Sequence, residues 1–430
     1  MKLPYSTNTL LYIISAYYLI FILTILIVFG PTPTNDTEGY IELAETCISE
    51  GEPYPCLSNI NNEPFIWNIG SVNLIILSKL LFFGSLFPLL VLMCFMKAGI
   101  ALLTAKIAQT LFDDRTALIS LIIFVIYPNN WGESTTLMSE IPTVFFSLLS
   151  VWLVLQKKKQ KVYVLAGILL CLSNWFRSIA PILLVSLFLY FIIFRRKIIL
   201  RRLVPYFFGY FLCVIILGTS SYIRTGHFIY KGDTLWYNMC YDAYDGAQIA
   251  PHWDEEPYIK GQPRYIENME ELDCFQCSAI WKDRCMSWIM SHKAEYLMKI
   301  PKKIWYMYYN DIDFISFSIA DKRDASANFI VLPYRNIREE IGNLSFPQRL
   351  ALVCTIIYLI VLMLFIGGIV KLICINKWKE LALPLFIIII GTLATVLVIH
   401  GEPRYKVPFM PFIIIIASTL FTNLPRSSSH

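Results

Sequence analysis

Repeated apolar stretches of helical length are the feature that most constrains the fold of this sequence. A helix needs about 20 apolar residues to cross the hydrocarbon layer of a membrane. The stretches that approach this length span residues 9–29, 86–108, 116–128, 139–156, 162–178, 179–194, 203–221, 347–373, 381–399 and 407–422. They lack the alternation of apolar and polar residues that a membrane β-strand requires. Because lipid cannot hydrogen-bond the backbone, helices must make these crossings.

The composition supports the same interpretation. Of the 430 residues, 57% are hydrophobic and only 16% are charged, which is more apolar than the core of a soluble domain requires. The first stretch follows Lys2, as in a signal peptide, but it is too long for such a peptide and no small-residue cleavage site follows it. We therefore expect an all-α polytopic membrane protein with about ten transmembrane helices.

Basic residues concentrate in three short loops between these stretches, at 157–161, 195–202 and 371–379. With a cytoplasmic amino terminus, alternate crossing places all three loops on one face of the membrane. Short loops rich in Lys and Arg are typical of the cytoplasmic face. The extracytoplasmic face then receives residues 30–85 and the long stretch 222–346.

These two extracytoplasmic segments are too long to be simple connections. Residues 30–85 contain two stretches with helical spacing of apolar residues, the first ending at Gly51, and we expect both to lie at the membrane surface. The segment between the seventh and eighth helices is mixed in charge and rich in Tyr and Trp. The expected organisation is a transmembrane module at 1–221, an extracytoplasmic segment at 222–346 and C-terminal transmembrane helices at 347–430.

Six cysteines fall outside the membrane in this topology: Cys47, Cys56, Cys240, Cys274, Cys277 and Cys285. An even number of cysteines in an oxidising compartment permits disulfides, and Cys47 with Cys56 is the most local pairing. The spacing of Cys274 and Cys277 also suits a metal or redox site, but neither a second such pair nor clustered His accompanies it. The disulfide is the stronger of the two predictions.

Ionisable residues at membrane depth indicate function, because a charge at the centre of a bilayer costs about 2.5–3.5 kcal/mol. Lys97 lies midway along the second stretch. The others lie at the ends of stretches and are Asp36, Glu38, Glu140, Arg177, Glu402 and Arg404. All of these ends map to the extracytoplasmic face. Their grouping indicates a cavity in which cations meet an anionic headgroup and a carboxylate takes a proton.

Each of these residues also has a purely structural interpretation. The position of Asp36 is also consistent with a loop carboxylate that caps the following helix, and that of Glu140 with a cap of its own helix. The positions of Arg177 and Arg404 are also consistent with interfacial anchors, whose side chains snorkel toward the headgroups. Lys97 is too central to snorkel, so its structural alternative is an ion pair inside the bundle.

The order of these motifs resembles the glycosyltransferase-C superfamily. The pattern Asp36-x-x-x-Tyr40-x-x-x-Ala44 resembles that superfamily's first loop, and the helix beginning Ser139-Glu140 resembles another of its motifs. The segment "SNWFRSIAPILL" looks like its Arg-bearing turn, and "GEPRYKVPFMPF" looks like its Arg-Tyr motif with spaced prolines. Among its branches, the chain is most similar to the dolichyl-phosphate-mannose protein mannosyltransferases and the bacterial aminoarabinose transferases of lipid A.

This resemblance implies a glycosyltransferase that moves a sugar from a polyprenyl-phosphate donor to an acceptor at the extracytoplasmic face, with inversion. The implied location is a cell membrane, the bacterial plasma membrane in particular, and the acceptor is a glycan, lipid or protein. The chain departs from that branch in having fewer predicted helices and in splitting its Asp-Glu pair into Asp36-Thr37-Glu38.

The resemblance also assigns roles. Asp36 is expected to be the base, with Glu38 as its substitute, because a hydroxyl is a poor nucleophile until a carboxylate removes its proton. The substrate-binding residues are expected to be Tyr40, Lys97, Glu140, Arg177, Arg404 and Tyr405. The two arginines and Lys97 would neutralise the leaving phosphate, and Glu140 would hold the sugar or orient an arginine.

Other functional classes find less support in the residues. A transporter or lipid flippase would use the same buried charges, but the hydropathy shows neither inverted repeats nor paired broken helices. A non-catalytic scaffold of the same fold would lack a cavity that joins Asp36 to the arginines. The sequence contains no glycine motif for nucleotide phosphates and no basic aromatic surface for nucleic acid. Nothing in it requires a cofactor, although a divalent cation is compatible with the carboxylates.

Overall fold

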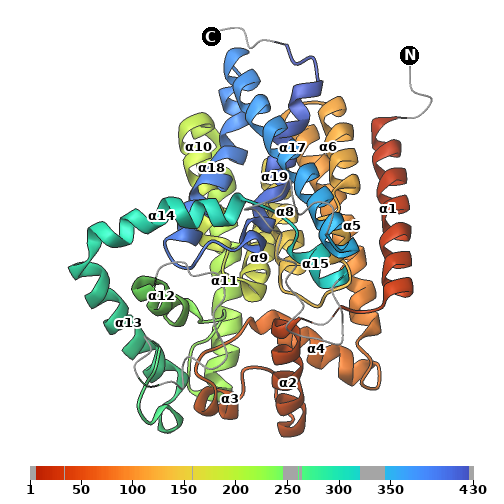
Figure 1. Cartoon of the computed structure of the whole chain (residues 1–430). Helices are drawn as coiled ribbons and strands as arrows, with labels where there is room; N and C mark the ends of the chain where they lie inside the picture. The colour runs from red at the N-terminus through yellow and green to blue at the C-terminus, as the bar shows by residue number, and fades with distance from the viewer. Residues whose placement is uncertain are drawn as a thin grey trace.

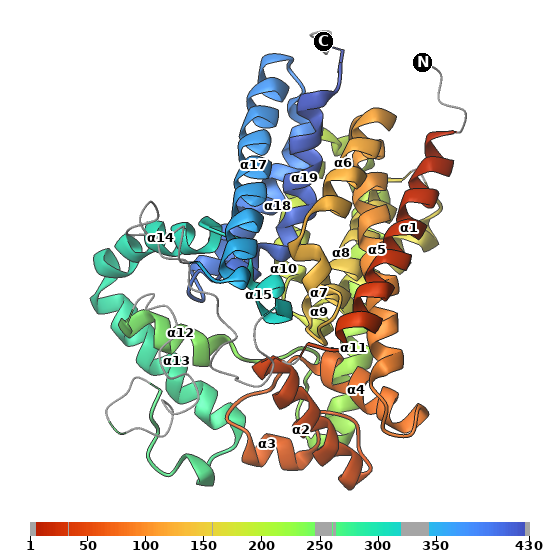
Figure 2. The ribbon, with the colours of Figure 1, turned by 45° about the vertical axis from the view of Figure 1, so that its right-hand side comes forward.

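The computed structural model describes residues 6–32, 34–156, 158–245, 260, 264–319 and 344–425. Every regular element in these residues is a helix, apart from one isolated β-bridge. The predicted all-α fold is therefore confirmed. The bundle (Figures 1 and 2) is built from α1 (Thr7–Phe29), α5 (Phe87–Leu111), α6 (Asp114–Ile126), α8 (Glu140–Leu155), α9 (Gln160–Phe176), α10 (Ala180–Phe194), α11 (Ile199–Thr225), α17 (Phe346–Cys374), α18 (Trp378–Val396), η6 (Pro403–Phe409) and α19 (Met410–Ser418).

Six segments of the described chain are long and apolar enough to cross a membrane. They are 7–29, 87–111, 196–225, 346–374, 378–396 and 403–421. Helices α8, α9 and α10 are also apolar but shorter. The protein is a multi-pass membrane protein, and its predicted number of about ten spans stays a prediction.

The outer surface of the bundle is apolar, as a surface in contact with lipid must be. Ile27 on α1, Ile223 on α11 and Met363 on α17 are among its exposed side chains. The helices pack through small residues, which allow backbones to approach closely in membranes. At the α9–α11 contact, a Cβ on Gly167 would lie 2.0 Å from the carbonyl oxygen of Tyr206, so this crossing requires glycine.

The start of α1, the end of α19 and the three basic loops lie at one end of the bundle. Lys106 near the end of α5 bonds Asn8 at the start of α1 (2.6 Å), and Lys371 of α17 bonds the carbonyl oxygen of Thr419 (2.7 Å). Arg202, which the sequence places in a basic loop, is buried instead. Its Nη1 donates to the carbonyl oxygens of Val154 (2.8 Å) and Leu155 (3.0 Å) and thereby satisfies the end of α8.

The opposite end of the bundle carries the helices of the two long connecting segments, and we call it the loop end (Figure 1). The segment between α1 and α5 forms α2 (Asn35–Glu50), α3 (Leu57–Asn62) and α4 (Ile69–Leu81), so both helices predicted there are present. The segment between α11 and α17 forms α12 (Leu235–Asp245), η3 (Met269–Glu271), α13 (Cys274–Ser291), α14 (Lys293–Tyr308) and α15 (Asp313–Ile319). Residues 246–259, 261–263 and 320–343 of the second segment lie outside the described residues.

These two segments are joined directly. The backbone N–H of Asp233 donates to the carbonyl oxygen of Ile66 (2.8 Å) in the β-bridge. Arg224, at the end of α11, donates to the carbonyl oxygens of Pro53 (2.9 Å) and Pro55 (3.1 Å). The segment between α1 and α5 therefore contacts both α11 and the segment that follows α11.

The predicted disulfide between Cys47 and Cys56 is not formed in the structure. The two sulfur atoms lie 3.7 Å apart as thiols. Both thiols instead donate to Oδ1 of Asn59, at 3.1 Å and 2.8 Å. Cys274 and Cys277 are buried on α13. In the described residues, no group of three or more His, Cys, Asp or Glu side chains is arranged to hold a metal.

Candidate active site

The first turn of α2 holds Asp36 at the loop end of the bundle. Thr34, not Asp36, caps this helix, because Oγ1 of Thr34 accepts from the backbone N–H of Thr37 (3.2 Å). Thr32, two residues before Thr34, is bonded through backbone and side chain to Thr135 (2.9 Å each). The capping role considered for Asp36 is thus filled by another residue, and its carboxylate is left to face the bundle.

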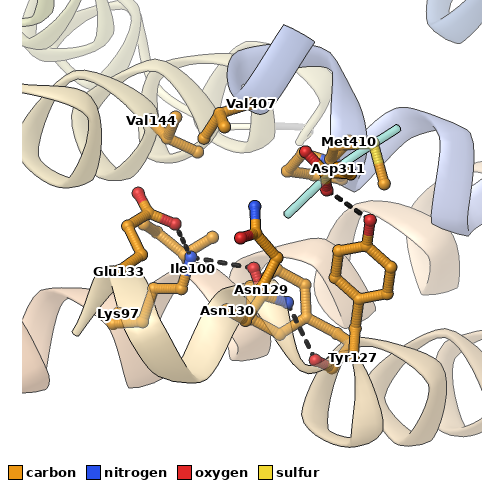
Figure 3. Close-up of a pocket in the computed structure, with 12 residues that line it drawn as sticks. Lys97, Ile100, Tyr127, Asn129, Asn130, Glu133, Val144, Asp311, Val407 and Met410 are labelled. Atoms are coloured by element: carbon orange, nitrogen blue, oxygen red, sulfur yellow. Dashed lines mark hydrogen bonds and ion pairs between the residues drawn. The ribbon is translucent and has the colours of Figure 1, made fainter. Parts of the chain in front are cut away.

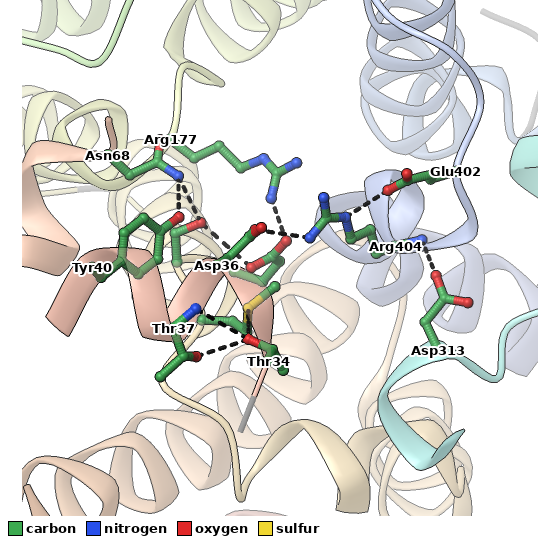
Figure 4. A network of polar contacts seen from close by, with 12 residues as sticks. Thr34, Asp36, Thr37, Tyr40, Asn68, Arg177, Asp313, Glu402 and Arg404 are labelled. Carbon is green, nitrogen blue, oxygen red and sulfur yellow. Dashed lines mark hydrogen bonds and ion pairs between the residues drawn. The ribbon is translucent and has the colours of Figure 1, made fainter. Parts of the chain in front are cut away.

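Arg404 is the centre of the charged group at this end (Figure 4). Its Nη1 donates to Oδ2 of Asp36 (2.8 Å) and its Nε donates to Oε2 of Glu402 (2.7 Å). Its backbone N–H donates to Oδ2 of Asp313 (3.0 Å), which begins α15. Oε1 of Glu402 also pairs with Nε2 of His400 (2.8 Å). Asp36 and Glu402 therefore hold the guanidinium group, and Asp313 holds the backbone of the same residue.

A second ion pair completes the group. Glu140, the first residue of α8, is fully buried and pairs with Arg177, which ends α9. Both arginines also lie over the aromatic ring of Tyr405, with guanidinium carbons 5.0 Å (Arg177) and 5.4 Å (Arg404) from its centroid. Cations bind the face of an aromatic ring favourably. Tyr405 therefore holds two like charges near each other, an arrangement that suits an anion.

Tyr40 connects α2 to the second ion pair through Asn68. The side-chain amide of Asn68 donates to Oη of Tyr40 (2.8 Å) and to Oγ of Ser139 (3.2 Å). The hydroxyl of Ser139 in turn donates to Oε2 of Glu140 (3.4 Å). Burial raises the pKa of Tyr40, and the charge of Asp36 raises it further, so this phenol stays neutral. Asn68 thus fixes the spacing between the helix of Asp36 and the helix of Glu140.

The carboxylates of the group differ in their proton affinity. Burial by itself would raise the pKa of Glu402, but the charges of Arg404 and His400 and their hydrogen bonds hold it well below its usual range. Asp313 behaves in the opposite way. Burial raises the pKa of Asp313 to about 7, although Lys406 and Arg404 act against this change. Glu402 therefore remains ionised, and Asp313 titrates near neutral pH.

Two of the predicted site residues are not brought to this group. Glu38 is exposed on the outer face of α2. Lys97 lies inside the bundle, where its Nζ pairs with Glu133 and donates to Oδ1 of Asn130 (2.9 Å), beside a small cavity (Figure 3). The side chains of Lys97 and Glu133 are each only 2% exposed. The structural alternative for Lys97, an ion pair within the bundle, describes its environment.

Several residues of the group carry no predicted role in the sequence analysis. Glu402 is singled out there only as an ionisable residue, and Asp313, His400 and Asn68 are not singled out at all. The sequence does contain a signal for His400. His400 and Glu402, separated by one glycine, follow an apolar stretch and lie shortly before Arg404. Asp313 contacts Arg404 across 91 positions, and nothing local to either residue indicates that contact.

Comparison with known proteins agrees with this architecture. Residues 72–222 match the family model of dolichyl-phosphate-mannose-protein mannosyltransferase. No curated protein sequence matches the chain. The crystal structure of the Archaeoglobus fulgidus oligosaccharyltransferase in its apo form superposes with a TM-score of 0.50 at 14% sequence identity, covering 94% of this chain and 50% of that one.

The chain shares the fold of this oligosaccharyltransferase over the residues that superpose. It spans about half the length of the oligosaccharyltransferase that it resembles. Glu140 and Arg177 lie inside the residues that the family model matches, whereas Asp36 and Arg404 lie outside them. The family match and the fold together support a membrane glycosyltransferase of the glycosyltransferase-C type. The resemblance predicted from the motifs is confirmed at this level.

Proposed function

We propose that this glycosyltransferase-C protein transfers one sugar from a polyprenyl-phosphate donor to an acceptor hydroxyl, with inversion, at the loop end of the bundle. The observation that carries the proposal is the meeting of Asp36, Arg177 and Arg404 around the ring of Tyr405. A base and two cations at one place are what transfer from a sugar phosphate needs. By the positive-inside rule the loop end faces the extracytoplasmic side, and the proposed location is a bacterial plasma membrane.

Asp36 is the proposed base. The acceptor oxygen attacks the anomeric carbon from the side opposite the phosphate, and a new carbon–oxygen bond forms as the bond from that carbon to the phosphate oxygen breaks. The hydroxyl proton passes to the carboxylate of Asp36. The electron pair of the broken bond leaves on the polyprenyl phosphate. Attack from the opposite side gives inversion at the anomeric carbon.

Arg404 and Arg177 are the proposed phosphate ligands. Arg404 uses Nε and Nη1 for carboxylates, and its Nη2 group has no hydrogen-bond partner among the described residues, so two N–H donors are available to a phosphate. A phosphate on Arg404 competes with Asp36 for the same positive charge. Because a less strongly paired carboxylate is a better proton acceptor, donor binding would prepare Asp36 for its role.

Glu140 is proposed to orient Arg177 rather than to contact the sugar, because its side chain is fully buried while that of Arg177 is 25% exposed. Tyr405 holds both guanidinium groups, and Tyr40 with Asn68 holds α2 at the correct distance. Lys97 has no part in phosphate binding here, because it is enclosed and paired with Glu133. Nothing in this scheme depends on a metal.

The proposal is tested by mass spectrometry of cell-envelope glycans from cells with and without the gene. Loss of the gene should remove one sugar from a lipid-linked glycan, lipid A, a protein or a wall polymer. The wild-type gene should restore that sugar, and a gene encoding Asp36→Asn, expressed to the same level, should not. Restoration by Asp36→Asn would contradict the proposed base, and unchanged glycans in the deletion strain would contradict the transferase itself.

A lipid flippase would give a different result in the same experiment. Its loss would leave the sugar on its polyprenyl carrier on the cytoplasmic side of the membrane. Purified protein in liposomes would then move the carrier across the bilayer without transferring sugar to an acceptor. Transfer by the purified protein distinguishes the two functions.

A further inference from the structure

Helix α14 crosses the end of a membrane-spanning helix instead of running beside it. The hydroxyl of Tyr296, near its start, donates to the carbonyl oxygen of Leu397 just after α18. Farther along, the carbonyl of Lys303 packs so closely on Gly401 that a Cβ there would lie 1.8 Å from the oxygen. Figure 1 shows α14 running across the direction of the bundle helices. These contacts fix α14 at the depth where the span ends.

The opposite face of α14 is apolar and exposed. The side chains of Leu297, Met298 and Trp305 are 58%, 73% and 67% exposed. Met298 and Trp305 are seven residues apart and Leu297 is beside them, so they form one stripe along the helix. Tyr296, Lys303 and Met307 are buried on the other side. Water is an unfavourable environment for such a stripe.

Lysines border this stripe. Helix α14 contains four lysines and one glutamate in 16 residues. Lys293 and Lys302 are exposed, and Lys302 lies over the ring of Tyr306 (5.5 Å). A helix that combines an apolar stripe containing Trp with flanking lysines is suited to the boundary between lipid headgroups and acyl chains. The positive charge favours headgroups that carry a net negative charge.

We propose that α14 is an interfacial helix that inserts its apolar stripe into the membrane surface and binds anionic lipid headgroups through its lysines. The depth set by Leu397 and Gly401 and the charge of the helix both point to lipid as the occupant of this face. The inference does not depend on the proposed function.

The position of α14 connects the membrane surface to the active site. Directly after α14, the carbonyl oxygen of Asn310 accepts from Nζ of Lys406 (2.5 Å). Three residues later, Asp313 accepts from the backbone N–H of Arg404. The segment that α14 anchors therefore holds η6, the element that carries Arg404.

The test uses spin labels in lipid nanodiscs that contain phosphatidylglycerol. Cys374 is the exposed cysteine and the other ten are buried, so Cys374→Ser gives a background in which Met298→Cys takes one nitroxide. Relaxation by oxygen, which enters lipid, is compared with relaxation by a water-soluble nickel chelate. Labels at Met363→Cys on α17 and Glu271→Cys on η3 provide references for lipid and water; both positions are exposed.

The expected ratio of oxygen to nickel accessibility at position 298 is closer to that at 363 than to that at 271. It should fall when phosphatidylcholine replaces all the phosphatidylglycerol, or when Lys293→Glu and Lys302→Glu are introduced together. A ratio equal to that at 271 would overturn the proposal. Protection of position 298 from both reagents would also overturn it, because a second copy or another part of the chain would then cover the helix.

Discussion

Two groups of acidic and basic side chains, one at the loop end and one inside the bundle, differ in their access to solvent. The first contains Asp36, Glu402 and Arg404, whose side chains are 28%, 28% and 21% exposed. The second contains Lys97 and Glu133, each 2% exposed. An enclosed ion pair is costly to break and does not readily exchange partners. A partly exposed ion pair, such as that of Arg404 with Asp36, can release one partner and bind a ligand instead.

The enclosed pair faces a second buried ion pair across the small cavity, and each pair joins two segments of the chain. Lys97 of α5 contacts Glu133 and Asn130 of the short helix α7 (Asn129–Glu133). On the far side of the small cavity, Lys406 of η6 pairs with Asp311 (3.0 Å), and both side chains are 1% exposed or less. The pair of Lys406 with Asp311 holds η6 in place and therefore helps to set the position of Arg404. From this difference we expect the more buried charges to serve the fold and the partly exposed charges to serve the proposed chemistry.

The largest expected effect is on stability and comes from the enclosed pair. Lys97→Met leaves the carboxylate of Glu133 buried without its cation, which should cost about 3–5 kcal/mol. Thermal unfolding in detergent should show a large fall in Tm. The double variant Lys97→Met with Glu133→Gln removes both charges and should recover most of the loss. A single variant as stable as wild type would contradict a structural role for the pair.

Next in size is the effect of Arg404 on donor binding. Arg404→Gln removes a charged hydrogen-bond donor, worth about 1.5–3 kcal/mol, so the affinity for undecaprenyl phosphate should fall roughly 10- to 100-fold. Arg404→Lys should lose less, because a point charge remains although the fork geometry does not. Binding to protein in nanodiscs can be followed by native mass spectrometry. Unchanged binding in both variants would make Arg404 a structural anchor.

A smaller effect concerns pH and Asp313. Lys406, Arg404, Glu402 and Asp311 surround this carboxyl, and burial raises its pKa to about 7. The folded state therefore binds a proton more tightly than the unfolded state, whose Asp pKa is about 3.9. Stability from this group is full below about pH 4 and is lost as the pH rises toward about 7.

Asp313→Asn keeps an oxygen for the N–H of Arg404 and removes the titration. The variant should lose this part of the pH dependence of Tm and should be more stable than wild type above pH 7. If the Tm of the variant and of wild type change with pH in parallel between pH 4 and 7, Asp313 does not titrate in that range.

The smallest effect is expected at Glu38. Its side chain is exposed, and its helical position directs it away from Asp36 two residues earlier. Surface substitutions of this kind change stability by less than about 0.5 kcal/mol. Glu38→Gln should therefore leave both Tm and transfer rate near wild type. A severe loss of transfer in Glu38→Gln would move the base by two residues and leave the fold unaffected.

The helices could be predicted from the sequence because the length of an apolar run is a local property. Helix α5 at 87–111 and α17 at 346–374 lie within three residues of their predicted bounds. The meeting of Asp36, Arg177 and Arg404 was also predictable, because span ends at one face of a membrane lie at one depth. Their resemblance to known motifs strengthened that prediction.

The partners of these residues could not be predicted in the same way. Asp36 and Arg404 are 368 positions apart, and the choice of Asp36 over Glu38 depends on where α2 begins. An ion pair was the structural alternative for Lys97, but its partner Glu133 is 36 positions away and nothing local to either residue indicates the contact. Proximity of Cys47 and Cys56 was correctly predicted, but the hydrogen bonds of both thiols to Asn59 depend on the turn between them.

The measurement that tests the central claim most directly is the turnover of purified Asp36→Asn protein with the sugar donor and the acceptor identified by glycan analysis. Asn keeps the size of the side chain and one oxygen for Arg404, but it cannot take a proton. The account predicts that the variant melts near the wild-type Tm, still binds undecaprenyl phosphate, and transfers sugar about 10²- to 10⁴-fold more slowly. Transfer at a rate near that of wild type would contradict it.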